Sequence, residues 1–113
     1  MTGDLDVSAN ITAITCSCSS DRNLKTNITN LDNSLENVTK LQGVSFDWKE
    51  KPEAGNQMGL IAQDVQEVYP DLVSMNSNTG NLTVNYIGII APLIESIKEL
   101  KQEVEFLKQK INN

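Results

Sequence analysis

Seven apolar residues near the end of the chain repeat with the alternating spacing of a coiled coil, and no other feature limits the fold as strongly. These residues, which we refer to as the seam, are separated by steps of 3, 4, 3, 4, 3 and 4: Ile90, Leu93, Ile97, Leu100, Val104, Leu107 and Ile111. A stripe this regular predicts a helix that packs its seam against a partner helix. We therefore expect a long helix over residues 87–111. If its regular part starts near Ile90, Pro92 lies in the first turn.

The spacing of the seam leaves the number of associating helices open. β-branched residues at its a positions and leucine at its d positions favour a parallel dimer. Glu103 and Lys108 flank the seam at positions that can pair between parallel helices. Ile89 and Ile94 widen the apolar stripe, so the beginning of the helix is expected to pack on the rest of the domain. The alternative is a single amphipathic helix that packs only on its own chain.

The residues before this helix predict a small α+β fold, and two of its segments have helical periodicity. Residues 29–41 place leucine and valine on one helical face, with Thr29 or Asp32 as the cap. Residues 58–69 predict a second helix, which Pro70 ends.

Other segments alternate with the period of two that is typical of strands. The clearest is residues 44–49, and residues 72–76 and 82–86 predict a hairpin across a short polar turn. Residues 50–57 are expected to form a loop between the strand and the second helix. A further strand is expected near the beginning of the chain, where the alternating residues are Val7, Ala9, Ile11 and Ala13. The opening Met-Thr-Gly-Asp suggests that the chain begins inside a longer, β-rich protein.

The composition excludes several classes of function. The chain has 113 residues, which suggests one domain, and its net charge of -6 argues against binding to nucleic acid. No stretch approaches the roughly 20 apolar residues of a membrane span. Only 39% of the residues are hydrophobic, so part of the fold is expected to be completed by other copies.

Metal and disulfide chemistry are not expected either. The chain has two cysteines, Cys16 and Cys18, and no histidine, which is too few ligands for a structural zinc site. A disulfide across one intervening residue would be strained, so two free thiols are expected.

Ser20 and Lys25 are the residues best suited to covalent chemistry in a chain without histidine. A serine needs a base before it can attack a carbonyl, and a neutral lysine can replace the histidine of the usual triad. Lowering a lysine pKa from about 10.4 towards 7 costs roughly 4–5 kcal/mol. Burial beside Leu24 and Ile28, or the charge of Arg22, would favour the neutral form. By spacing alone, a solvated loop remains the simpler explanation of the pair.

Ring size selects the bond that Ser20 can cut in its own chain. Attack of Oγ on the carbonyl of Ser20 itself would close a strained four-membered ring. Attack on the carbonyl of Ser19 passes through a five-membered ring and gives an ester, which water then hydrolyses. The favoured scissile bond is therefore Ser19–Ser20, while attack by one protomer on another stays open. Asp21 can cap a short helical turn after the nucleophile.

Five stretches together resemble the C-terminal intramolecular chaperone domain of endosialidases and of other phage tail spikes, tail fibres and neck appendages, the S74 peptidase family. The family has Ser-Asp-x-x-Leu-Lys-x-Asn-Ile, Gly-Val-x-Phe-x-Trp, Gly-Leu-Ile-Ala-Gln-(Glu/Asp)-Val, aromatic-Pro-x-Leu-Val and Val-Asp-Tyr motifs. In this chain the motifs stand in the same order, with Asn85 in place of the last aspartate, at residues 20–28, 43–48, 59–65, 69–73 and 84–86. The resemblance covers residues 20 to about 107.

The resemblance implies a domain at the end of a homotrimeric, β-rich fibre or spike. In that family the domain trimerises, guides the folding of the preceding stalk and releases itself by autoproteolysis with a Ser-Lys dyad. The resemblance therefore implies an autocatalytic serine endopeptidase in which Ser20 is the nucleophile and Lys25 the general base. Asp21 and Asn27 match motif positions, and we expect them to orient the loop.

The same resemblance divides the chain. Residues 1–19 become the end of the upstream stalk and residues 20–113 the chaperone domain, whose helix over residues 87–111 forms a parallel trimeric coiled coil. The family thus favours a trimer where the seam alone favours a dimer. Its implied partners are two further copies of the chain and the stalk of the same polypeptide, with no cofactor. The precursor is expected in the host cytoplasm, with the domain released from the mature virion protein.

Two other functions are compatible with the same residues. The first is a non-cleaving trimerisation and folding cap with the same fold, and the second is a host-binding tip domain that stays on the fibre. The intact pair of Ser20 and Lys25 favours self-cleavage over the cap. Nothing in the sequence indicates a ligand for a tip domain.

Overall fold

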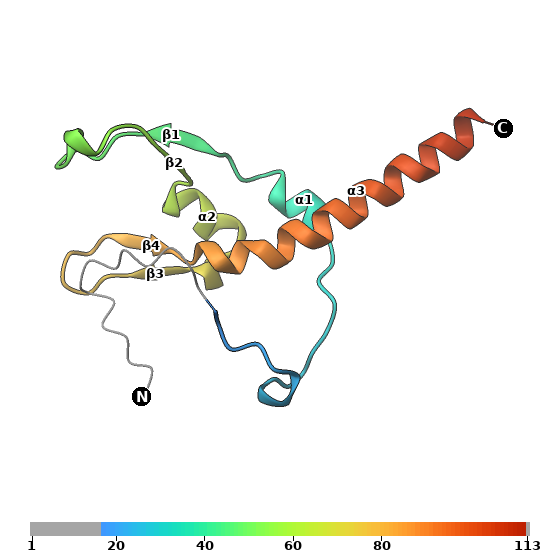
Figure 1. Cartoon of the computed structure of the whole chain (residues 1–113), viewed down its shortest axis with the longest axis horizontal. Coiled ribbons are helices and arrows are strands. Elements are labelled where there is room, and N and C mark those ends of the chain that lie inside the picture. Colours follow the sequence, from blue (N-terminus) through green and yellow to red (C-terminus); the bar gives the residue numbers. More distant parts are fainter. Residues whose placement is uncertain (1–16, 113) are drawn as a thin grey trace.

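The computed structural model describes residues 17–112, so the strand predicted at Val7 to Ala13 lies outside the described part. The α+β prediction is confirmed: two hairpins and one short helix lie towards the beginning of a long C-terminal helix, and another short helix packs against that helix further along (Figure 1). In chain order the helices and strands are α1 (Ser34–Val38), β1 (Val44–Phe46), β2 (Gln57–Gly59), α2 (Ala62–Val68), β3 (Val73–Met75), β4 (Leu82–Val84) and α3 (Ile90–Ile111).

The long helix α3 begins at Ile90, the start that places Pro92 in its first turn, and not at residue 87 as the predicted range had it. It has 22 residues and buries Pro92 in its first turn, where the missing proline N–H costs no helical hydrogen bond. A 3-10 turn, Tyr86–Ile89, leads into it, and the Asn85 side chain caps this turn by accepting from Gly88 N at 3.2 Å. The helix projects beyond the rest of the fold, and residues 101–112 are all exposed (Figure 1).

Two antiparallel hairpins stand beside the beginning of α3. β3 and β4 pair as predicted, although each is three residues long and shorter than expected. β1 is also shorter than expected, and it pairs with β2, with Val44 opposite Gly59. This second hairpin was not predicted, because residues 50–57 were expected to be a loop and residues 58–69 a helix. The residues of β2 were divided between these two predicted segments, so no strand pattern was recognised there.

The two short helices are shorter than their apolar patterns predicted. α1 was expected over residues 29–41 with Thr29 or Asp32 as its cap, and both expectations were wrong. Asn33 turns the chain instead, with a φ of 54° in the left-handed region that asparagine tolerates, and its side chain makes no capping bond. α2 begins at Ala62, later than predicted, because the residues before it belong to β2.

A carboxylate from α3 supplies the missing cap of α1. Glu99 Oε2 accepts from Ser34 N at 2.9 Å, and Glu99 Oε1 accepts from Leu35 N at 3.4 Å. Burial raises the pKa of Tyr69 beside this contact; a hydrogen bond with Asn37 opposes the rise, and the charge of Glu99 adds to it. Glu99 therefore fixes α1 on the long helix, although it follows Ser34 by 65 residues.

We expect Glu99→Ala to lower the free energy of unfolding by about 1–3 kcal/mol, because two N–H groups at the beginning of α1 lose a charged acceptor. Glu99→Gln keeps one side-chain oxygen as an acceptor and should lose less. Thermal unfolding followed by circular dichroism, at one protein concentration, measures both. Glu105→Ala, on an exposed face of the same helix, is the matched control and should change stability by no more than about 0.5 kcal/mol. Equal losses at the two positions would contradict the capping role.

The described residues bury very little apolar surface. Their buried hydrophobic residues are Val65, at 1% exposure, and Ile89, at 6%. The radius of gyration is 18.2 Å, against about 13 Å for a compact chain of this length. Ile89 packs on the domain as predicted, whereas Ile94 does not, since it is 52% exposed. A core this small agrees with the expectation that other copies complete the fold.

Residues from three of the quoted motifs contact one another. Tyr86 Oη accepts from Leu60 N at 3.0 Å, and a Cβ on Gly59 would lie 2.8 Å from this hydroxyl oxygen. The same Cβ would lie 3.2 Å from the Phe46 ring, so the contact needs a glycine. Phe46 packs edge-to-face on Trp48, with ring centroids 5.0 Å apart. These residues join the β1–β2 hairpin to the segment that begins α3.

The composition also led to expectations about the cysteines, membrane spans and metal sites, and the structure bears on them only for residues 17–112. Cys18 is disulfide-bonded, so the prediction of a free thiol was wrong there, and Cys16 lies outside the described part. Within residues 17–112, no helix combines the length and the apolar character that a membrane span needs. The same residues contain no cluster of three or more side chains suited to holding a metal ion.

Candidate functional site

The segment before α1 stands apart from the rest of the fold. Residues 17–33, which we refer to as the arm, are all exposed. From α1 the arm extends away from α3 and then turns back towards the N-terminal end of that helix (Figure 1). Its apolar residues Leu24, Ile28 and Leu31 are 73%, 56% and 47% exposed. Any site on the arm is therefore open to solvent in the single chain.

Ser20 and Lys25 come together on this arm. Two backbone hydrogen bonds of 3.0 Å close a 3-10 turn at Arg22–Leu24. The turn carries Lys25 back towards the residues before it, so that Lys25 Nζ donates a hydrogen bond to Ser20 Oγ at 2.7 Å. The fold thus places the two side chains of the expected dyad in direct contact.

The other two motif residues shape the backbone around the pair. Asp21 Oδ1 accepts from Asn23 N at 2.8 Å, so its carboxylate caps the turn as predicted. Asn27 has a φ of 53°, in the left-handed region where asparagine is enriched, two positions after Lys25. Both observations concern the backbone of the loop, and the orienting role expected of the two residues stays a prediction.

This geometry allows proton transfer between the two side chains. A separation of 2.7 Å lies within the range in which a general base can take a proton directly. A lysine is a base only after it has lost its own proton, and burial favours that neutral form. The wall expected from Leu24 and Ile28 does not enclose the pair, because both side chains are exposed. In the single chain the arm aligns the reacting groups and leaves them in solvent.

The seam forms a continuous exposed stripe along α3. Its seven residues are between 40% and 81% exposed. The same helix packs on its own domain through a different flank, where Pro92 and Ser96 are buried and Ser96 Oγ donates to Pro92 O at 2.7 Å. Glu99, which caps α1, lies on this flank as well. The chain therefore covers one side of α3 itself and leaves the coiled-coil side uncovered.

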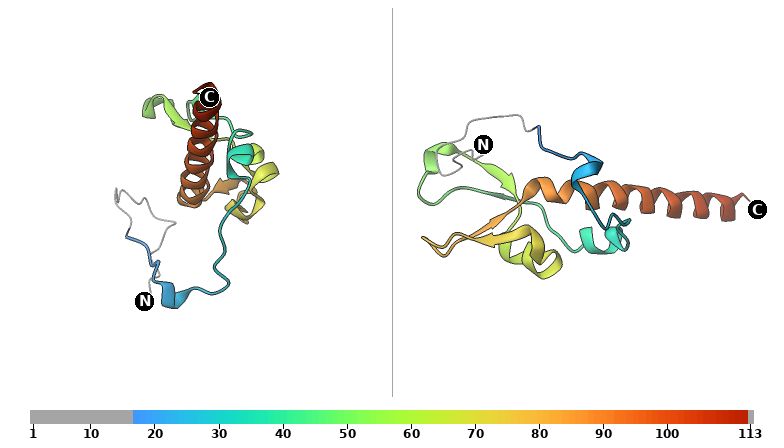
Figure 2. Two further views of the ribbon diagram at one scale, coloured as in Figure 1. Left: turned by 90° about the vertical axis from the view of Figure 1, so that its right-hand side faces the viewer. Right: turned by 90° about the horizontal axis from the view of Figure 1, so that it is seen from below.

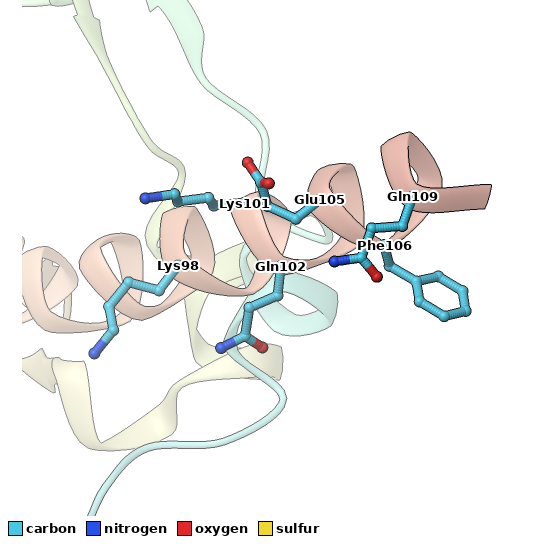
Figure 3. A pocket seen from close by; sticks show the side chains of 6 residues that line it. All are labelled: Lys98, Lys101, Gln102, Glu105, Phe106 and Gln109. Carbon is cyan, nitrogen blue, oxygen red and sulfur yellow. The ribbon is translucent and has the colours of Figure 1, made fainter. Parts of the chain in front are cut away.

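Two hollows of the described surface lie away from the dyad. One is on α3 near its end, where lysine, glutamine and glutamate side chains stand beside Phe106 (Figure 3). Lys110 lies over the Phe106 ring, 4.7 Å from its centroid. The other is lined by residues of both hairpins, among them Trp48 and Met58. No serine is among the described residues that line either hollow, so neither offers an alternative to Ser20 as a nucleophile.

Comparison with known families identifies the part of the chain that contains the dyad. Residues 20–74 match the Peptidase_S74 family model, described as chaperone of endosialidase. The match begins at Ser20, the residue that Lys25 contacts. Residues 20–74 are thus identified with the chaperone of endosialidase family. The family expected from the five motifs is therefore confirmed.

The relatives of this chaperone of endosialidase domain include phage tail fibre proteins. Long tail fiber protein Gp37 of Enterobacteria phage K3 is 36% identical over 115 residues, which cover 96% of this chain and 9% of that protein. The Gp37 of Enterobacteria phage T2 gives the same values. The Gp37 of Enterobacteria phage M1 is 33% identical over 96 residues, or 79% of this chain and 38% of that protein. The chain thus spans a small part of the curated relatives it matches.

Glu99 is the residue of this chain that sequence reasoning most clearly missed. It lies on a flank of α3 away from the seam, where helical periodicity predicts only a solvated acid. Its hydrogen bonds join segments 64 and 65 residues apart, and no local pattern signals such a contact. Asn33 carried a weaker signal, since asparagine is several-fold enriched at positive φ.

Proposed function

We propose that this chain is a self-cleaving intramolecular chaperone of a phage tail fibre. It forms a parallel homotrimer through α3, assists the folding of an upstream stalk in the same polypeptide, and then cuts the Ser19–Ser20 bond. The observation that carries the proposal is the 2.7 Å hydrogen bond between Lys25 Nζ and Ser20 Oγ. The precursor is made in the host cytoplasm as part of the tail, and the cut separates the chaperone domain from the mature virion protein.

The proposed reaction transfers the chain from nitrogen to oxygen before water enters. Neutral Lys25 takes the proton of the Ser20 hydroxyl while Oγ attacks the carbonyl carbon of Ser19 and closes a five-membered ring. The carbon–nitrogen bond then breaks, and Lys25 returns the proton to the departing Ser20 nitrogen. Ser19 is now joined to Ser20 Oγ as an ester. Water hydrolyses this ester to the Ser19 carboxylate and the Ser20 hydroxyl, and the Ser20 amine becomes a new N-terminus.

The exposed seam supports the trimer. Burying a leucine or isoleucine side chain contributes roughly 1.5–3 kcal/mol, and the single chain leaves all seven seam residues uncovered. Association of parallel α3 helices covers them together and gathers three stalk ends at one place. The domain can then act as a template for the stalk, a role in line with the description of the matched family as chaperone of endosialidase.

Cleavage makes the assisted folding of the stalk a one-way process. A stalk that folds while attached to the trimeric domain can also unfold with that template in place. After the Ser19–Ser20 bond is cut, the template is no longer attached to the stalk chains. Unfolding then lacks an assisted way back, and the mature fibre is trapped kinetically.

A non-cleaving trimerisation and folding cap is the second candidate. The observation that favours it is the full exposure of the dyad region in the single chain, since burial is what activates a lysine base. The two candidates share the fold and the trimer and differ only at the Ser19–Ser20 bond.

Expression of the domain behind its upstream stalk separates the two candidates. We expect two fragments on a denaturing gel, because the folded trimer cuts itself once per chain. N-terminal sequencing of the smaller fragment should read Ser-Asp-Arg. A start at Asp21 would contradict the five-membered ring, and a single uncut band from a folded trimer would favour the cap.

A further inference from the structure

The arm carries apolar side chains that its own chain leaves uncovered. These side chains are Leu24, Ile28 and Leu31, and each is at least 47% exposed. The end of the arm that adjoins α1, which we refer to as its root, is nevertheless held in place, because Ser34 N donates a hydrogen bond to Glu99 on α3. A segment with a fixed root and an uncovered apolar surface needs a contact that the single chain does not provide.

α3 carries a second exposed apolar surface, next to the seam. With Ile90 and Ile97 at a positions, Ile94 and Lys101 of α3 stand at e positions; together with Ile87, in the 3-10 turn just before the helix, they form what we refer to as the e side. The two isoleucines are 55% and 52% exposed, and the lysine is exposed too. An apolar e position such as Ile94 is unusual for a coiled coil that is covered only by its seam. This surface therefore also needs a contact.

The domain occupies the opposite flank of the helix. Ser96 stands at a g position, Pro92 and Glu99 stand at c positions, and these are the residues that pack on or bind the domain. In a parallel coiled coil the g side of one helix adjoins the e side of its neighbour. Association through the seam therefore brings the domain and arm root of one chain next to the e side of another.

We infer that the arm of each protomer docks on the e side of the neighbouring protomer's α3, an inference that rests on the proposed trimer. Viewed along α3, the arm sweeps around one side of the helix at a distance from it (Figure 2). It runs from its root towards the beginning of α3, which is also the direction in which the e side changes from lysine to isoleucine (Figure 1). In the assembly, the α3 helix of the neighbouring protomer lies between the arm and the α3 helix of the protomer to which the arm belongs.

The order of side chains on the arm fits this contact. Asp32, close to the root, is opposite in charge to Lys101 of the neighbour, which lies about 3 Å beyond the level of Glu99 and has a long side chain that can extend back towards the arm. Leu31 comes next on the arm, and three extended residues reach about 10 Å from the root. The axial distance from the level of Glu99 to the level of Ile94 is about 7.5 Å, because a helix rises 1.5 Å per residue. Leu31 can therefore reach the exposed isoleucine of the neighbouring helix.

Docking would also complete the surroundings of the dyad. Leu24 lies in the turn that joins Ser20 to Lys25, so covering this side chain reduces the access of water to the pair. Burial favours the neutral form of a lysine, which is the form that can act as a base. A chain without neighbours keeps its dyad in solvent, and assembly becomes the condition for cleavage.

Two co-expressed chains test the contact by disulfide formation. Both carry Cys16→Ser and Cys18→Ser; one also carries Leu31→Cys, and the other, with a different tag, carries Ile94→Cys. Mild oxidation is expected to shift most of the mixed pairs to a two-tag band on a non-reducing gel, because a disulfide requires Cβ atoms about 3.5–4.5 Å apart. Both cysteines follow Ser20, so the band does not depend on self-cleavage.

The matched control replaces Ile94→Cys with Gln102→Cys, on a face of α3 away from the e side (Figure 3). It should give no two-tag band, and equal bands in the two experiments would overturn the docking. A trimer in sedimentation that lacks the two-tag band would overturn the docking and leave the proposed function standing. A monomer in sedimentation would overturn both.

A second pair keeps every apolar side chain in place. Asp32→Cys on one chain and Lys101→Cys on the other should give the same two-tag band. This pair decides the result if the variants at the apolar positions fail to fold. The absence of the band from a folded trimer of the second pair would again overturn the docking.

Discussion

Leu100→Asp is expected to abolish the proposed trimer. Leu100 lies in the middle of the seam and is 49% exposed in the single chain, so a parallel trimer would gather three copies of it in one apolar layer. Each aspartate would then have to be buried without a cation, which costs several kcal/mol per ion. We expect sedimentation equilibrium to give a mass near 12.4 kDa for the variant, and about three times that value for the unchanged chain, less residues 1–19 of each copy that has been cut.

Gln102→Asp is the control for this prediction. It adds the same charge to the same helix two residues further along, at an exposed position outside the seam. The trimer should persist, because this carboxylate stays in water. A trimer that survives Leu100→Asp would show that the seam is not its interface. A mass of two chains for the unchanged protein would instead support the dimer that the a and d residues favour.

Helix α3 was predictable because everything that defines it is local. The spacing of the seam sets the face that the helix leaves uncovered, and Pro92 marks the first turn. The β3–β4 hairpin was predictable for a similar reason, since two short apolar segments stand on either side of one polar turn. In both cases the residues that interact, or that share a face, are neighbours in the sequence.

α1 shows why other parts of the fold were not predictable. Leu31 completes a helical pattern with the residues after it, yet it lies on the arm, outside the helix. The helix begins after Asn33 because a carboxylate far along the chain, that of Glu99, binds its first N–H groups. β2 was missed because its three residues fall where the loop signal of residues 50–57 meets the helical pattern of residues 58–69.

In the candidate site, too, local contacts were predictable and the surroundings of the residues were not. The contact between Ser20 and Lys25, and the cap from Asp21, involve residues within one turn, and the sequence motif anticipates both. The exposure of Leu24 and Ile28 was not anticipated, because the expected wall assumed that one chain would enclose its own dyad. What covers these side chains depends on assembly, which local sequence patterns do not describe.

Ser20→Ala is expected to leave the fibre precursor uncut, and Lys25→Arg is expected to be nearly as inactive. Alanine removes the attacking oxygen. Arginine keeps the positive charge and a donor for Ser20, but it does not lose its proton in proteins and so cannot act as a base. Loss of a general base lowers a rate by about 10²–10⁴-fold. The ratio of cut to uncut precursor, followed over time on denaturing gels, measures both effects.

Lys25→Arg distinguishes base catalysis from a charge that merely shapes the arm. If the lysine served only as a donor to Ser20, arginine would preserve much of the activity. Lys40→Arg, at an exposed position after α1, should cleave at the unchanged rate and controls for the loss of a lysine as such. Ser20→Cys should still cleave, because a thiol can form the corresponding thioester through the same five-membered ring. Cleavage of Ser20→Ala at the original bond would mean that the nucleophile is another group, and the 2.7 Å contact would then be structural.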